Sequence, residues 1–156
     1  HRVSSSSSLR CVQTGNEIIH GAELKLPVLH NPGLGEPGAF ISDFGQAVAA
    51  FKDLDPIGIV NRMLGGEMIQ GHRTVEEGSV LLLKSFLNKM PEKGSIQVEV
   101  THDTILAALL YYLQGLGSIG EEAWPRMMEG ALFWRKAGRV YWRWRRETRS
   151  QEMMVG

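Results

Sequence analysis

Two short segments far apart in the chain carry residue types that bind phosphate. The first, residues 5–14 (SSSSLRCVQT), places the guanidinium of Arg10 just inside a predicted helix start, and the second, Thr101-His102-Asp103, places an imidazole directly after a predicted strand. Arginine presents a rigid fork of N–H donors that matches phosphate oxygens, and imidazole can donate to a phosphoryl oxygen or move a proton near neutral pH. With the hydroxyls of Ser5 and Ser6, these groups predict half of a phosphate pocket.

The same residues also have purely structural explanations, and the sequence leaves both kinds open. Arg10 could be a surface arginine on a helix that Ser8 caps, preceded by a flexible run of serines. His102 could be a buried histidine fixed by its neighbour, with Asp103 capping the helix that follows.

Periodic apolar residues and capping signals predict the elements that position these groups. The predicted helices cover residues 9–21, 44–51, 56–64, 75–90 and 104–114. Their predicted caps are Ser8, Asp43, Thr74 (with Glu77 in capping-box spacing) and Asp103. Strands are predicted at residues 1–3, within 24–43, at 95–101, and as a hairpin of 131–136 and 139–144 around the turn Ala137-Gly138. The end, residues 145–156, is predicted to be frayed.

This order of elements predicts an α/β fold with three layers, helix, sheet and helix, and a mostly parallel sheet followed by a C-terminal antiparallel hairpin. Sites in such folds lie at the carboxyl ends of strands. Both segments fall at strand-to-helix junctions, so we expect Arg10 and His102 to converge on one edge of the sheet.

Three stretches of the chain resemble the histidine phosphatase superfamily, the phosphoglycerate-mutase-like proteins. Residues 5–14 are similar to the family's second conserved block, with Ser7 where the family usually has Pro and with Gly15 where it has Ala. Residues 100–103 (VTHD) resemble its late strand-His block, and residues 34–40 (LGEPGAF) a loop found in one group of its members. The resemblance runs from about Val3 to Trp144.

The resemblance implies one phosphoglycerate-mutase-like domain over residues 1–145, followed by the frayed tail 146–156. It implies transfer of a phosphoryl group from a small phosphorylated substrate to a histidine and then to water or back to substrate, without a cofactor or metal. Arg10 and His102 align with two phosphate-pocket residues of the family.

The family's nucleophilic histidine lies in an Arg-His-Gly motif at the end of the first strand, and this chain has no such motif. His1-Arg2 and His72-Arg73 have the reverse order, so we assign no nucleophile. We therefore expect an amino-terminally truncated fragment, missing its first central strand and inactive by itself. The alternative is a degenerate homologue that binds phosphate or a phosphoester without turnover.

Members of the family use a carboxyl group to protonate the leaving oxygen, and two residues are candidates for that role. Glu36 lies in the Gly-Pro-rich loop, and Asp103 follows His102 directly. A carboxyl facing a phosphate should have a raised pKa, which suits an acid. The structural alternatives are an exposed loop charge for Glu36 and a helix cap for Asp103.

Composition limits the other partners. Lys plus Arg and Asp plus Glu both number 17, so the formal net charge is zero and no general attraction to nucleic acid or to anionic membranes is expected.

The single cysteine, Cys11, and the lack of a signal peptide or apolar span favour a cytoplasmic location. The Trp and Arg residues of the predicted hairpin alternate, which predicts strands with one face in the core and the other in water. An uncovered sheet edge would favour association of copies of the chain.

Overall fold

The computed structural model describes residues 1–35, 37–88 and 90–152, and the chain divides into two compact units, His1–Trp124 and Pro125–Gly156. The predicted α/β class is confirmed, because the first unit holds a parallel sheet with helices and the second an antiparallel sheet. Within the described part of the chain, no helix has the length and apolar character needed to cross a bilayer.

The first unit is built on a three-stranded parallel sheet in the order β2-β1-β3. Its strands are β1 (Arg2–Ser5), β2 (Val28–His30) and β3 (Gln97–Val100). The central strand β1 pairs Val3 with Val28 on one side and with Val98 on the other. The helices are α1 (Leu9–Gly21), α2 (Phe44–Asp53), α3 (Pro56–Leu64), α4 (Val75–Leu87) and α5 (Asp103–Leu113), with short 3-10 turns η1 (Pro32–Leu34) and η2 (Glu121–Ala123).

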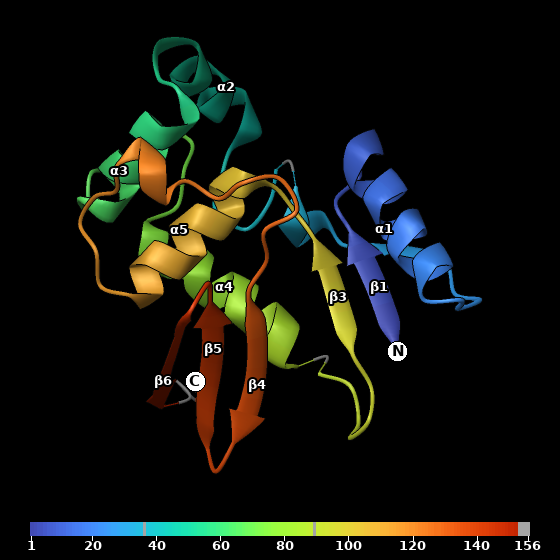
Figure 1. The fold of residues 1–156 in the computed structure, drawn as a ribbon. Coiled ribbons are helices and arrows are strands. Elements are labelled where there is room, and N and C mark those ends of the chain that lie inside the picture. The colour runs from blue at the N-terminus through green and yellow to red at the C-terminus, as the bar shows by residue number, and fades with distance from the viewer. Residues whose placement is uncertain (36, 89, 153–156) are drawn as a thin grey trace. The chain divides into compact units, whose positions relative to one another are not determined.

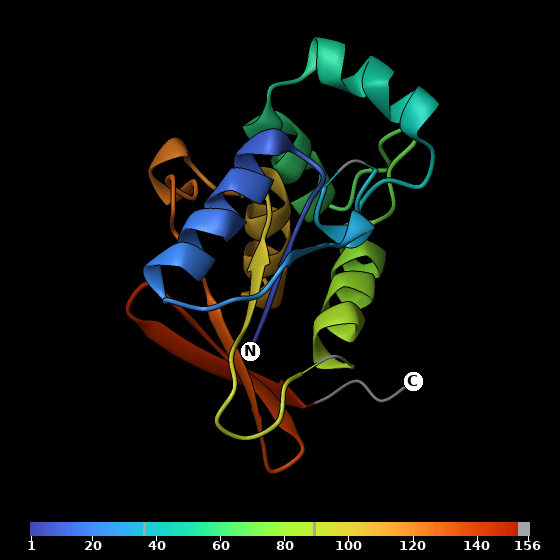
Figure 2. The ribbon, with the colours of Figure 1, turned by 90° about the vertical axis from the view of Figure 1, so that its right-hand side faces the viewer.

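Helices lie on both sides of this sheet, which gives the three predicted layers. Figures 1 and 2 show α1 on one side of β1 and β3 and α4 on the other. A Cβ on Gly15 would lie 3.0 Å from the side chain of Val28, so this glycine lets α1 pack closely on the sheet. On the other side, α5 contacts α3 and α4 around buried residues that include Ile59, Leu82 and Leu109.

Most predicted helix starts are confirmed. Asp43 and Asp55 accept hydrogen bonds from the first-turn amides of α2 and α3, and Thr74 with Glu77 forms the complete capping box of α4. Ser8 is confirmed as the N-cap residue of α1, but its side chain makes no capping bond. The predicted cap Asp103 is wrong, because Asp103 is the first residue of α5 and His102 is at the N-cap.

The second unit is a three-stranded antiparallel sheet of β4 (Leu132–Lys136), β5 (Arg139–Trp144) and β6 (Glu147–Glu152), in that order. The predicted hairpin between β4 and β5 is confirmed. Ala137 and Gly138 have φ angles of 49° and 73°, as a two-residue turn between twisted strands requires. Trp142 and Trp144 are buried and Arg143 between them is exposed, as the alternation predicts.

The prediction of a frayed end from residue 145 is wrong for residues 147–152. These residues pair with β5 along their whole length, from Glu147 opposite Trp144 to Glu152 opposite Arg139. The segment is polar throughout, so it lacks the apolar alternation that marks a strand, and its pairing comes from main-chain hydrogen bonds. Residues 153–156 of the expected tail lie outside the described residues.

Candidate functional site

Two helices begin at the same edge of the parallel sheet. β1 leads through residues 6–8 into α1, and the neighbouring strand β3 leads through residues 101–102 into α5. The amide of Ser6 donates to the carbonyl of Val100 at 3.1 Å, which continues the pairing of the two strands to their ends. The positive ends of both helix dipoles therefore point toward this edge, where they favour an anion.

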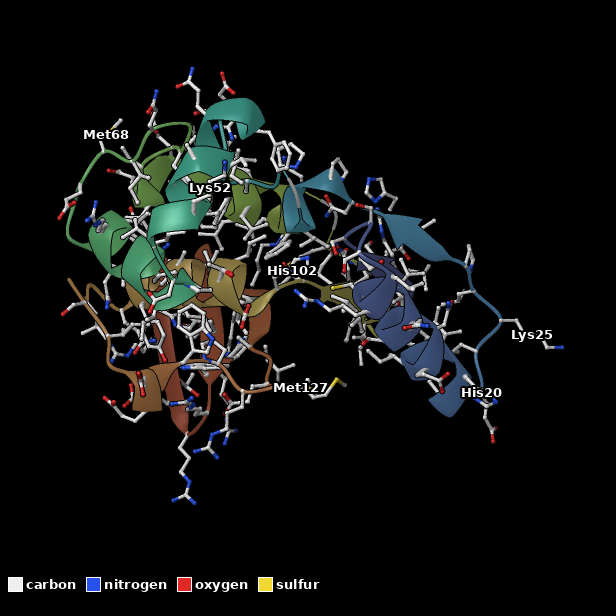
Figure 3. All side chains as sticks on the ribbon, turned by 90° about the horizontal axis from the view of Figure 1, so that it is seen from above. His20, Lys25, Lys52, Met68, His102 and Met127 are labelled. Carbon is white, nitrogen blue, oxygen red and sulfur yellow. The ribbon has the colours of Figure 1, made fainter. Side chains whose placement is uncertain are left out.

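The structure brings Arg10 and His102 into direct contact at this edge. Nη2 of Arg10 lies 2.8 Å from Nδ1 of His102, although the residues come from different helix starts. Oγ of Ser6 lies 3.1 Å from Nε2 of the same imidazole. We call Ser6, Arg10 and His102 the strand-end cluster. Figure 3, seen from above, shows His102 beside α1.

The members of the strand-end cluster differ in their access to solvent. Ser6 is only 1% exposed, His102 is partly exposed and Arg10 is exposed. Ser6 Oγ also accepts a hydrogen bond from the amide of Ser8 at 3.4 Å, so the hydroxyl is fixed by main chain as well as by the imidazole. The cluster thus has a fixed inner member and an outer guanidinium that an anion can reach.

Residues of α1, of the chain after β3 and of the loop after η1 lie next to the strand-end cluster. The thiol of the buried Cys11 lies 3.6 Å from the carbonyl of Thr101 and 3.9 Å from Nε2 of His102. Thr101 Oγ1 donates to the carbonyl of Leu34 at 2.8 Å, which ties the end of β3 to η1. A Cβ on Gly35 would lie 2.6 Å from Cβ of Ser6, so the loop after η1 approaches the cluster closely only with glycine at this position.

Two other predicted site residues, Ser5 and Asp103, have hydrogen-bond partners of their own. Ser5 is 1% exposed, and its hydroxyl already donates to the carbonyl of the next residue, Ser6. The carboxylate of Asp103 is exposed and accepts from the amide of Thr104 and from the indole of Trp124 at 3.0 Å. Glu36 lies outside the described residues.

Asn31 is a polar residue of this edge that the sequence reasoning missed. Only 7% exposed, it follows β2 directly, and its amide N–H donates to the carbonyl of Ser5. Its side-chain Nδ2 donates to Glu99 at 3.2 Å, and its Oδ1 accepts from the amide of Gly33. The available signal was its position directly after a strand, which Ser6 shares; His102 lies two residues after β3.

Two hollows in the first unit lie away from the strand-end cluster. One, of about 440 Å³, is lined by residues of α3, α4 and α5 that include Met63, Glu76 and Tyr112. Burial, and then the nearby charge of Glu76, raise the pKa of Tyr112. The other, of about 490 Å³, is lined by residues that include His72 and Glu77. Neither hollow is lined by Arg10 or His102, so the case for a site at the sheet edge comes from charge and hydrogen-bond geometry.

Comparison with protein-family models, with curated proteins and with solved structures finds no match to this chain. Within residues 1–35, 37–88 and 90–152, no three His, Cys, Asp or Glu side chains gather as metal ligands would. What the cluster offers chemically is a guanidinium fork, an imidazole and two helix N-termini at one place on the surface, a set of groups that complements a small oxyanion.

Proposed function

We propose that the strand-end cluster binds the phosphate group of a small phosphorylated compound. The observation that carries this proposal is the 2.8 Å contact between Arg10 and His102, which joins two polar groups from segments 92 residues apart at the start of two helices. A guanidinium of this kind binds phosphate through paired, charge-assisted hydrogen bonds.

Isothermal titration calorimetry with inorganic phosphate tests the binding. We expect the Arg10→Gln variant to bind at least about tenfold more weakly, because a hydrogen bond to a charged group contributes about 2 kcal/mol. The matched control is Arg62→Gln, which removes an exposed arginine of α3 that pairs with Glu67. Equal losses in both variants, or no binding by the unaltered chain, would reject the proposal.

We further propose that this domain belongs to a phosphatase or mutase of the histidine phosphatase type, in which the phosphoryl group passes through a phosphohistidine. Support for this step is the resemblance of residues 5–14 and 100–103 to the family's blocks. Arg10 and His102 would hold the transferred group, and Asp103 or Glu36 would supply the proton to the leaving oxygen. We assign no nucleophile within this chain.

A non-catalytic phosphoester-binding module is the second candidate function, and the absence of Arg-His-Gly from the sequence favours it for this chain. Release of phosphate from p-nitrophenyl phosphate separates the two. Binding without release supports the module, whereas release that disappears in the His102→Ala variant supports the enzyme.

A further inference from the structure

As a hydrogen bond, the contact between Arg10 and His102 requires Nδ1 of the imidazole to be the acceptor. A guanidinium carries only donors, so a nitrogen 2.8 Å from Nη2 must offer a lone pair. Nδ1 of His102 is therefore unprotonated, and the single ring proton of the neutral imidazole sits on Nε2. That nitrogen faces Oγ of Ser6 at 3.1 Å, which accepts the proton in a hydrogen bond.

Charged and titratable groups from two helices, α1 and α5, lie near the ring of His102. From α1, Arg10 and the positive end of the helix dipole face the ring, and Cys11 contributes a thiol whose sulfur lies 3.9 Å from Nε2. From α5, Asp103 lies next in the chain; its carboxylate oxygens accept from Thr104 and Trp124, and its negative charge partly offsets the positive charge of Arg10. A second positive charge on the ring would face the guanidinium at hydrogen-bond distance.

An oxyanion that binds Arg10 changes this balance. An oxyanion that takes the N–H donor of Nη2 that now faces Nδ1 would replace the Arg10–His102 hydrogen bond. The lone pair of Nδ1 would face the lone pairs of the anion, and two acceptors cannot form a hydrogen bond. A proton taken from water or buffer onto Nδ1 converts this repulsion into a charge-assisted hydrogen bond to the anion.

We propose that anion binding at the strand-end cluster is coupled to the uptake of one proton by Nδ1 of His102, and that the Arg10–His102 hydrogen bond is the resting contact that the anion replaces. This inference rests on the proposed phosphate-binding function. Proton uptake on binding makes the affinity depend on pH. In the pH range where the imidazole of the anion-free protein is neutral, the affinity for the anion falls up to about tenfold for each unit of pH.

Sulfate is the probe that tests the coupling, because it does not itself titrate near neutral pH. We expect calorimetry at about pH 7.5, in two buffers with different enthalpies of ionisation, to show close to one proton taken up per sulfate bound. Nitrogen NMR of the imidazole gives a second readout. The free protein should show His102 with its proton on Nε2 alone, and the sulfate complex should show both ring nitrogens protonated.

Matched variants assign the proton to His102. The His102→Gln variant, checked for folding by circular dichroism, should still bind sulfate through Arg10, more weakly and without proton uptake. His20, exposed at the far end of α1 from His102, is the internal control and its ring signals should not change (Figure 3).

The outcomes separate the coupling from the proposed function. Sulfate binding by the unaltered chain without proton uptake, uptake that persists in His102→Gln, or a free protein already protonated at Nδ1 would each overturn the coupling while leaving phosphate binding intact. Failure of both sulfate and phosphate to bind would instead reject the proposed function and the coupling with it.

Discussion

Ser5 and Ser6 are adjacent and equally buried, but their hydroxyls bond to different groups. Ser5 Oγ donates to the neighbouring carbonyl of Ser6, whereas Ser6 Oγ contacts Nε2 of His102. Ser5 is the last residue of β1 and Ser6 the first residue after it, so neighbours of one residue type have different partners. Substitutions of the two serines therefore separate an effect on phosphate binding at the strand-end cluster from an effect on stability alone.

Replacing each serine by alanine gives a matched test at the residue scale. Ser5→Ala loses one buried hydrogen bond and Ser6→Ala two partly buried ones, and we expect each variant to reduce the free energy of unfolding by about 1 kcal/mol in urea denaturation. Only Ser6→Ala should also weaken phosphate binding, by several-fold, because it frees the imidazole that faces the anion. If Ser5→Ala weakens binding as much as Ser6→Ala, Ser5 is itself a phosphate ligand and the geometry has been misread.

Among the elements, α4 contains a glycine whose effect the sequence alone would misjudge. Gly78 lies in the interior of the helix, where alanine is normally favoured by about 1 kcal/mol. In the structure, a Cβ at this position would overlap the ring of the buried Phe40. Because overpacking costs about 1–3 kcal/mol, the packing term outweighs the gain in helix propensity.

We therefore expect Gly78→Ala to lower the midpoint of urea unfolding, followed by far-UV circular dichroism. The control is Gly21→Ala at the last residue of α1, where an added Cβ meets no atom within 4 Å. This control should be neutral or slightly stabilising. A stabilised Gly78→Ala variant would show that Phe40 moves aside easily and that α4 is not packed as described.

The elements that the sequence predicted well are those fixed by local signals. Asp43 and the Thr74–Glu77 pair mark helix starts through bonds within three residues, so their pattern is readable without the fold. The residues predicted less well depend on distant partners. β6 is a strand only because β5 lies beside it, and Asn31 is fixed by Glu99, 68 residues away. The meeting of Arg10 with His102 was predictable because parallel neighbouring strands end at the same edge.

In the second unit, the ion pair between Glu129 and Arg145 makes stability depend on pH in the acid range. Glu129 accepts from the guanidinium of Arg145, which follows β5, and from the amide of Arg126, and these bonds lower the pKa of its carboxyl. A carboxyl whose pKa is lower in the folded state stabilises the fold above its unfolded pKa, about 4.3. That contribution is lost as the pH falls through the folded value.

We expect NMR titration to place the midpoint of Glu129 below that of a free glutamate, and the acid-induced loss of stability to be smaller in Glu129→Gln. The effect should be modest and should weaken with added salt, because both side chains are partly exposed, at 29% for Glu129 and 35% for Arg145. A normal midpoint for Glu129 would mean that the ion pair does not persist in solution.

For the whole molecule, 17 basic and 17 acidic side chains cancel, so no long-range field draws anions to the surface. Salt at 0.1 M screens interactions between charges more than about 10 Å apart, so anion binding depends on the groups that touch the ligand.

Two charge reversals test this dependence. Arg10→Glu and Arg62→Glu change the net charge equally, but α1 and α3 lie on opposite sides of the first unit (Figure 1). We expect Arg62→Glu to change the phosphate Kd by less than about twofold, because this substitution acts only through the screened field. Arg10→Glu should abolish measurable binding, because it places a carboxylate at the site. Comparable losses from both would mean that phosphate responds to the overall charge of the protein, and the local arrangement of Arg10 and His102 would then not explain the binding.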